Sequence, residues 1–271
     1  LGAIAIKAAI ERAGISPDMV DEVVLGNAIQ AAEAGYAARL ASLKSGIPHE
    51  TPTIAVNRQC SSGLEAINMA AQLVRTGEAE IVVAGGTENM SQVPFLIEYR
   101  ARFDGLRMGN SQLVDGLTEG LGCPVNRYHM GVTAENVAER FSVSRSDQDE
   151  LALISHHRAS SAITQGRFSD QITEVSVPQR RGDAVIVTED EGPRADTTIE
   201  GLANLRPVFK KDGTVTAGNA SSINDGSAAI VMMSATKAAD LGLKPRMKWH
   251  TRGIAGVEPA VMGTGPVPAV E

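Results

Sequence analysis

Residues 54–86 read IAVNRQCSSGLEAINMAAQLVRTGEAEIVVAGG, and this stretch decides the fold. A short apolar run at residues 54–56 precedes a helical pattern from about Ser61 to Thr76, whose predicted inner face carries Leu64, Ile67, Ala71 and Val74. Gly77 is placed to end this helix, and a second apolar run follows at residues 80–84. Short apolar strands that alternate with amphipathic helices predict an α/β fold with a mostly parallel sheet covered by helices.

The same alternation extends in both directions along the chain. Further helices are predicted over residues 1–13, 31–45, 133–141, 145–165 and 236–241, and further strands over residues 23–25, 172–177, 184–187 and 227–233. Gly14 is predicted to cap the first helix, and Ser144 with Asp147 matches a capping box before the longest one. From about Ser91 to Tyr128 no period is sustained, and so long a loop excursion inside a compact enzyme is usually functional.

The composition argues against several classes of function. The 271 residues are 43% apolar and carry a net charge of −7, without a basic stripe interleaved with aromatics, so a nucleic-acid partner is not expected. No apolar run approaches the roughly 20 residues that a membrane-spanning helix needs, so no membrane partner is expected. Two cysteines are too few for a disulfide-stabilised secreted scaffold. A reducing compartment is therefore expected, by default the cytoplasm, with an organellar matrix left open.

Cys60 is the strongest candidate for a chemical role. It lies between the strand at residues 54–56 and the start of the next helix. Backbone N–H groups and the positive end of the helix dipole favour the thiolate there, which is the form that attacks. The same N–H groups can hold an oxyanion, and Gly63 is expected to let another backbone approach closely. The alternative is a buried structural cysteine without chemistry.

Blocks of sequence along the chain resemble the thiolase family. Residues 57–66, NRQCSSGLEA, are similar to the family's nucleophile motif, and residues 81–91, IVVAGGTENMS, to the strand and loop that follow it. Residues 129–138, 214–226 and 261–266 are similar to three later blocks. The blocks come in the family's order and span nearly the whole chain, which leaves little room for coincidence.

The resemblance implies a thiolase-like α/β fold. Two related βαβ-rich halves would stack in sheet–helix layers, with a loop domain inserted in the first half. Residues 1–92 would form the first half without its leading strand, residues 93–213 the loop domain and connections, and residues 214–271 the start of an incomplete second half. The pattern at Leu1 is that of the middle of a helix, and the pattern at residues 267–271 is that of the start of another helix. Both ends are therefore expected to be cuts through a longer protein.

The resemblance also implies roles for individual residues. Cys60 matches the cysteine that takes the acyl group from acyl-CoA. The implied substrate-binding and CoA-binding residues are His129 and Met130 at the pantetheine tunnel and acyl pocket, Ser221 at the pantetheine, Phe209 near the CoA, Arg194 near the nucleotide, and Leu117 and Met262 at the pocket wall. No metal and no bound cofactor are implied, because the coenzyme A thioesters are the substrates.

Three catalytic blocks of the family do not occur in this sequence: Asn-Glu-Ala-Phe, Gly-His-Pro and a Cys-x-Gly block. In the family they supply an asparagine that orients water, a histidine that activates the nucleophile and a second cysteine that acts as base. Cys123 lies between Gly122 and Pro124, outside such a glycine-rich context, and is expected to be a bystander. The chain alone is therefore expected to give negligible condensation, although some acylation of Cys60 can survive.

The implied reaction is a ping-pong acyl transfer. Cys60 would be acylated by acyl-CoA, and the carbanion of acetyl-CoA would then attack the thioester to give 3-ketoacyl-CoA; the reverse direction is thiolytic cleavage. His129 favours acetoacetyl-CoA as the product, whereas residues 59–63, QCSSG, resemble long-chain degradative thiolases, which stay an alternative. A catalytically incomplete thiolase-fold fragment and a decarboxylating ketosynthase also stay open as readings of the chain. The expected partners are acyl-CoA and CoA, and the expected assembly is a homodimer or homotetramer.

Overall fold

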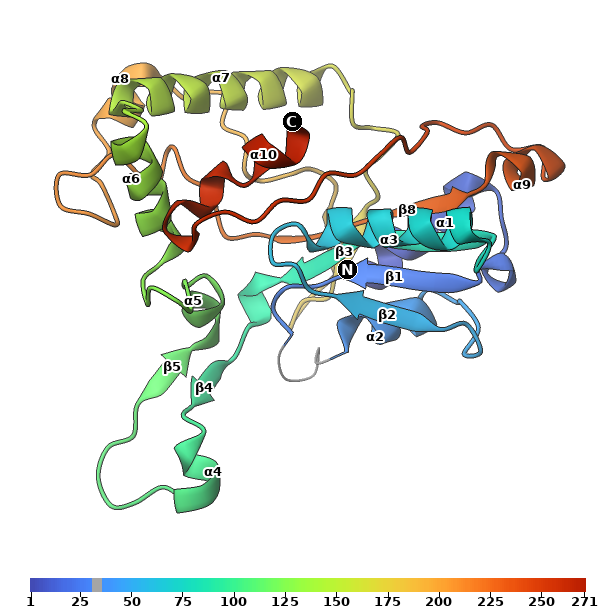
Figure 1. Cartoon of the computed structure of the whole chain (residues 1–271), viewed down its shortest axis with the longest axis horizontal. Helices are drawn as coiled ribbons and strands as arrows, with labels where there is room; N and C mark the ends of the chain where they lie inside the picture. Colours follow the sequence, from blue (N-terminus) through green and yellow to red (C-terminus); the bar gives the residue numbers. More distant parts are fainter. Residues whose placement is uncertain (31–35) are drawn as a thin grey trace. The chain divides into compact units, whose positions relative to one another are not determined.

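The computed structural model describes residues 1–30 and 36–271, which fall into two compact units (Figure 1). The first unit comprises residues 1–120 and 223–252, and the second comprises residues 121–222 and 253–271. Residues 31–35, the start of the helix predicted over residues 31–45, lie outside the described residues.

The described elements follow the predicted alternation. In the first unit they are α1 Gly2–Ala13, η1 Pro17–Met19, β1 Glu22–Gly26, α2 Ala37–Lys44, β2 Thr53–Val56, α3 Ser62–Thr76, β3 Ile81–Asn89, η3 Met90–Gln92, β4 Phe95–Ile97, α4 Arg100–Asp104, β5 Leu113–Asp115, α5 Gly116–Gly120, β8 Asp225–Met233 and α9 Ala235–Asp240. In the second unit they are α6 Met130–Arg140, α7 Arg145–Thr164, β6 Val175–Val177, β7 Val185–Val187, α8 Ile199–Ala203, η4 Pro259–Thr264 and α10 Pro266–Val270.

The first unit is built on one sheet with the strand order β2-β1-β3-β8. Strand β1 pairs in parallel with both β2 and β3. Val24 of β1 lies opposite Ile54 of β2 on one side and Ala84 of β3 on the other. Strand β8 runs antiparallel to β3, with Ala84 opposite Ile230. The prediction of a mostly parallel sheet is confirmed, with an antiparallel strand at one edge.

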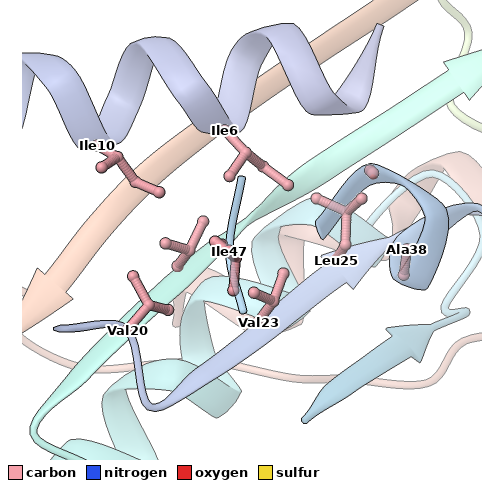
Figure 2. Close-up of a cluster of buried hydrophobic side chains, with 9 residues drawn as sticks. Ile6, Ile10, Val20, Val23, Leu25, Ala38 and Ile47 are labelled. Carbon is pink, nitrogen blue, oxygen red and sulfur yellow. The ribbon is translucent and has the colours of Figure 1, made fainter. Parts of the chain in front are cut away.

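Helices cover both faces of this sheet, and each face has its own core. On one face Ile6 and Ile10 point from α1 toward Val23 and Leu25 of β1 (Figure 2). On the other face the alternate strand residue Val24 packs with the alanines of α3. Because successive strand residues point to opposite faces, a sheet buried on both sides needs continuous apolar strands, which is the pattern seen in the sequence.

Helix α3 turns the predicted face inward except at Leu64. Ala66 and Ala70 are fully buried against the strands, and Ile67 and Val74 pack beside them as predicted, but Leu64 is 63% exposed. Leu64 precedes Ala66 by two residues, which is about 200° around a helix, so it points away once Ala66 faces the sheet. The small alanines let the helix axis lie close to the strands.

The structure groups the chain into units that differ from the predicted domains. Strand β8 pairs with β3 along its whole length, from Ile81 opposite Met233 to Asn89 opposite Asp225. Hydrogen bonding along the edge of β3 therefore places β8 in the first unit, and not in a second half beginning at residue 214. The excursion after residue 91 also stays with the first unit up to residue 120, where strands β4 and β5 form a hairpin that projects away from the sheet (Figure 1).

The second unit contains the longest helix, α7. The predicted capping box before it is confirmed, because the backbone N–H of Asp147 donates to Ser144 Oγ at 3.1 Å and the backbone N–H of Ser144 donates to Asp147 Oδ2 at 3.0 Å. Helix α6 packs against η4, and Asn136 Nδ2 donates to the Ala260 carbonyl at 2.9 Å. Within the described residues we find no helix that combines the length and the apolar character needed to cross a membrane.

Candidate functional site

Cys60 is exposed in a tight turn between β2 and α3. The residue before it, Gln59, has a left-handed φ of +49°, which reverses the chain direction just ahead of the helix. Hydrogen bonds close the turn: the N–H of Arg58 donates to Ser62 Oγ at 2.9 Å, and the N–H of Ser62 donates to the Gln59 carbonyl at 3.0 Å. Because Cys60 is exposed at the start of the helix, the alternative of a buried structural cysteine is wrong.

Gly26, and not Gly63, allows the close backbone approach at this turn. A β-carbon on Gly26 would lie 2.4 Å from the carbonyl carbon of Ser62 and 2.5 Å from the nitrogen of Gly63. A β-carbon on Gly63 would meet nothing closer than 3.8 Å, which is ordinary contact. Since Gly26 is the last residue of β1, the start of α3 rests directly on the carboxyl end of that strand.

Charged groups brace the turn on both sides. Glu65, whose side chain is 8% exposed, lies 3.5 Å from Arg58 and 3.6 Å from Arg252. Glu88 accepts the backbone N–H groups of Ala28 and Ile29 at 2.8 and 3.1 Å. The Arg58–Glu65 pair joins the residues before and after Cys60. The loop that Glu88 holds contacts the turn through Asn57 Nδ2, which donates to the Ala28 carbonyl at 2.9 Å.

A small recess opens beside the turn, with a volume of about 210 Å³. Its lining is mainly apolar and consists of Ala28, Ile29, Gln30, Gln59, Val93, Pro94, Leu96, Gly116 and Gly120. Gln59 adjoins Cys60 in sequence, so the recess lies next to the Cys60 turn. Leu117, predicted at a pocket wall, lies in α5 between the lining residues Gly116 and Gly120 and is half-buried.

His129 and Phe209, two of the predicted CoA-contacting residues, are in contact in the second unit. Their rings stack with centroids 4.7 Å apart and planes inclined by 12°. His129 Nδ1 accepts the N–H of Gly131 at 3.0 Å, so the neutral ring carries its proton on Nε2. A β-carbon on Gly131 would lie 2.2 Å from the Phe209 ring, so the missing side chain makes room for the stack. Met130 follows as the first residue of α6.

The remaining predicted residues lie apart from this stack in the sequence. Ser221 is exposed after the turn at residues 213–219, and Met262 is 40% exposed in η4. Arg194 is exposed in the loop before α8, where its backbone N–H donates to His156 Nδ1 at 3.2 Å. Cys123 is buried and accepts the N–H of Asn126 at 3.3 Å, in keeping with a bystander.

Glu135 was not singled out from the sequence, yet the residue is only 3% exposed and its carboxylate is fully hydrogen-bonded. It accepts the N–H of Thr214 at 2.9 Å on both oxygens, the Thr214 hydroxyl at 2.9 Å and the N–H of Val215 at 2.8 Å. The sequence did hold a signal, because Glu135 lies three residues from both Val132 and Ala138 on an apolar stripe of the helix. A carboxylate in such a stripe needs a buried partner.

Replacing Glu135 by glutamine should lower the free energy of unfolding by about 2 kcal/mol at pH 7, because the carboxylate's charge-assisted hydrogen bonds are lost. Burial raises the pKa of Glu135, but hydrogen bonds from Val215 and Thr214 and the nearby Lys210 charge outweigh it and leave this pKa below its ordinary value. The wild-type advantage is therefore complete above the ordinary glutamate pKa and lost as the pH falls through the lowered one. Urea unfolding from pH 7 down to acid pH measures the difference.

The matched control is Glu139→Gln, which removes an exposed carboxylate one helical turn further along α6. Glu139 pairs with Lys210 at 2.8 Å at the surface, where an ion pair contributes little. An equal loss of stability in both variants, or a gap between Glu135→Gln and wild type that widens toward acid pH, would contradict the prediction.

Comparison with known proteins matches most of the chain to one family. Residues 1–236 match the family model of the thiolase N-terminal domain, which runs past the boundary predicted at residue 214. An acetyl-CoA acetyltransferase of Pseudomonas aeruginosa is 49% identical over 270 residues, covering 99% of this chain and 68% of that protein. A probable acetyl-CoA acyltransferase of Staphylococcus aureus is 47% identical over 272 residues, covering 100% of this chain and 69% of that protein.

Solved structures show the same likeness in three dimensions. The crystal structure of the Bacillus anthracis acetyl-CoA acetyltransferase superposes with a TM-score of 0.95 at 43% identity, covering 100% of this chain and 68% of that one. Human mitochondrial 3-ketoacyl-CoA thiolase, in complex with CoA, superposes with a TM-score of 0.92 at 39% identity, covering 99% of this chain and 67% of that one. The chain thus spans about two thirds of the length of these relatives.

Proposed function

The chain belongs to the thiolase family of acyltransferases, and from this premise we propose that Cys60 takes an acyl group from acyl-CoA as a thioester. The observation that carries the proposal is the exposed thiol in a braced turn at the start of α3. The positive end of that helix favours the oxyanion that forms at the carbonyl during attack. The helix rests on the end of β1, so the sulfur is held in place.

The proposed step is a thioester exchange. The Cys60 sulfur attacks the carbonyl carbon of acyl-CoA, the bond from that carbon to the CoA sulfur breaks, and CoA leaves as a thiolate that takes up a proton. In the second half-reaction, the methyl group of a second acetyl-CoA loses a proton to a base, a role that the Cys-x-Gly block fills in the family. The carbanion bonds to the acyl carbonyl carbon, the bond from that carbon to the Cys60 sulfur breaks, and 3-ketoacyl-CoA leaves. Because this sequence contains none of the family's Asn-Glu-Ala-Phe, Gly-His-Pro or Cys-x-Gly blocks, acylation is the half-reaction to test on this chain.

We assign the CoA contacts to the second unit. The stacked rings of His129 and Phe209 offer a flat surface for the pantetheine arm, with Met130 beside them. Ser221 would supply a polar contact, and the exposed Arg194 would meet the nucleotide phosphates. Met262 remains a proposed pocket-wall residue of the second unit, and Leu117 remains a proposed wall residue of the recess in the first unit. The coenzyme A thioester is a substrate, and the proposed chemistry calls for no bound cofactor.

We favour acetyl-CoA over long-chain substrates, since the relatives named as acetyl-CoA acetyltransferases have the higher identities to this chain. The likeness to a 3-ketoacyl-CoA thiolase supports long-chain cleavage as the second candidate. We further propose that the protein works in the cytoplasm as a homodimer or homotetramer. Large apolar side chains exposed along the hairpin, including Phe95, Phe103 and Leu113, support self-association.

Incubation with acetyl-CoA should add one acetyl group to the chain, at Cys60. Peptide mapping by mass spectrometry locates the group, and the buried Cys123 serves as an internal control in the same sample. A parallel reaction with palmitoyl-CoA is expected to be slower. Acetylation at another residue, or none at all, would refute the proposal, and faster transfer from palmitoyl-CoA would reverse the substrate preference.

A further inference from the structure

A half-buried amide, that of Asn219, ties the turn at residues 213–219 together. Asn219 Oδ1 accepts the N–H of Thr216 at 2.8 Å, and Asn219 Nδ2 donates to the Thr214 carbonyl at 3.0 Å. The same Nδ2 donates to Asp149 Oδ1 of α7 at 2.9 Å. One side chain therefore both closes the turn and joins it to a helix.

Asp149 is a paired charge and a firm anchor. Its side chain is 2% exposed, and its second oxygen accepts Arg145 Nε at 2.7 Å. Arg145 in turn donates through Nη2 to the carbonyls of Leu202 and Leu205, at 2.6 and 3.1 Å. The turn is thus connected through α7 to the end of α8.

Close packing holds the turn at both ends. A β-carbon on Gly213 would lie 2.4 Å from Glu135 Oε1, and one on Gly218 would lie 2.5 Å from Leu205 Cδ1. Thr216, between them, is completely buried. Together with the hydrogen bonds of Glu135, these contacts restrain the backbone of the turn.

The turn leads directly to two residues of the proposed CoA surface. Ser221 follows Asn219 by two residues, and the N–H of Val208, next to Phe209, donates to the Val215 carbonyl at 3.0 Å. A loop that served stability alone could be packed with apolar side chains, which avoid the desolvation cost of buried charges. Two buried carboxylates and an amide instead specify the backbone path.

We propose that Asn219, with Asp149 and Glu135, is a positioning residue that sets the turn so that Ser221 and Phe209 meet the pantetheine arm; this inference rests on the proposed function. The network acts on capture of the CoA thioester and not on the reactivity of the Cys60 thiol. When the turn is released, the ground state and the transition state lose the same binding energy. KM therefore rises, and the maximal acylation rate stays nearly unchanged.

The test compares acylation with alkylation of Cys60 in the Asn219→Ala variant. Acylation by acetyl-CoA over a range of concentrations should show a KM raised about tenfold or more, with a maximal rate within about threefold of wild type. Alkylation by iodoacetamide, which carries no pantetheine, should proceed within about twofold of the wild-type rate. Glu139→Gln, at the surface of α6, is the matched control and should leave all three values unchanged.

Each outcome decides a different point. An unchanged KM in folded Asn219→Ala, or a fall in alkylation as large as the fall in acylation, overturns the inference. If wild-type protein is not acylated at Cys60, the proposed function fails first and the inference fails with it. Should Asn219→Ala not fold, Asn219→Asp replaces it: this variant keeps the acceptor for Thr216 but sets a carboxylate against Asp149, and the same rise in KM is required.

Discussion

Cys60→Ser will abolish acyl transfer from acetyl-CoA, with the rate of acylation falling by at least about 10³-fold. A serine hydroxyl at this turn would be un-ionised and a far weaker nucleophile than a thiolate, and the start of α3 cannot compensate. The change replaces sulfur by oxygen on an exposed side chain, so the turn and the helix behind it stay intact. Release of free CoA and the intact mass of the protein measure the loss.

Cys123→Ser is the matched control for that experiment. Cys123 is buried and accepts a hydrogen bond from the N–H of Asn126 at 3.3 Å, a bond that a serine hydroxyl can also accept. Its acylation should match wild type. Acylation that persists in Cys60→Ser and disappears in Cys123→Ser would transfer the nucleophile's role to the other cysteine and overturn the site.

Gly26→Ala should destabilise the first unit by about 3–5 kcal/mol. The added β-carbon would meet backbone atoms of Ser62 and Gly63 at 2.4 and 2.5 Å, and backbone cannot move aside as a flexible side chain can. Helix α3 would have to lift from the end of β1 and carry the Cys60 turn with it. Urea unfolding gives the stability, and iodoacetamide alkylation reports any change in the environment of Cys60.

The neighbouring substitution Gly63→Ala isolates this steric effect. Its β-carbon would find nothing nearer than 3.8 Å, and alanine is a better helix former than glycine, so stability should stay level or rise slightly. Equal destabilisation by both changes would contradict the prediction that the absence of a side chain at Gly26 allows α3 to pack on the end of β1.

Local signals in the sequence correctly predicted the covered parallel strands, the glycine caps and the capping box. Gly14 and Gly77 end their helices with φ values of +71° and +76°, and Ser144 opens α7 as predicted. Such features depend on residues within about one helical turn of each other, so they can be predicted from the sequence. The position of Cys60 between strand and helix was legible for the same reason.

Contacts between residues distant in sequence could be decided only by the tertiary structure. Strand β8 lies against β3 although about 140 residues separate them, as the pairing of Ser227 with Thr87 shows. The hydrophobic pattern of neither strand predicts which strand it pairs with. In the same way the sequence determined that Glu135 is a carboxylate on an apolar stripe, while the fold decided that it binds the turn at Thr214. The sequence by itself determines where strands, helices and a reactive thiol lie along the chain, because short-range geometry and propensity suffice. Packing decides the rest, because it exists only once distant segments meet. It selects the partner of each strand, the glycine that must lack a side chain and the groups that pair with buried charges.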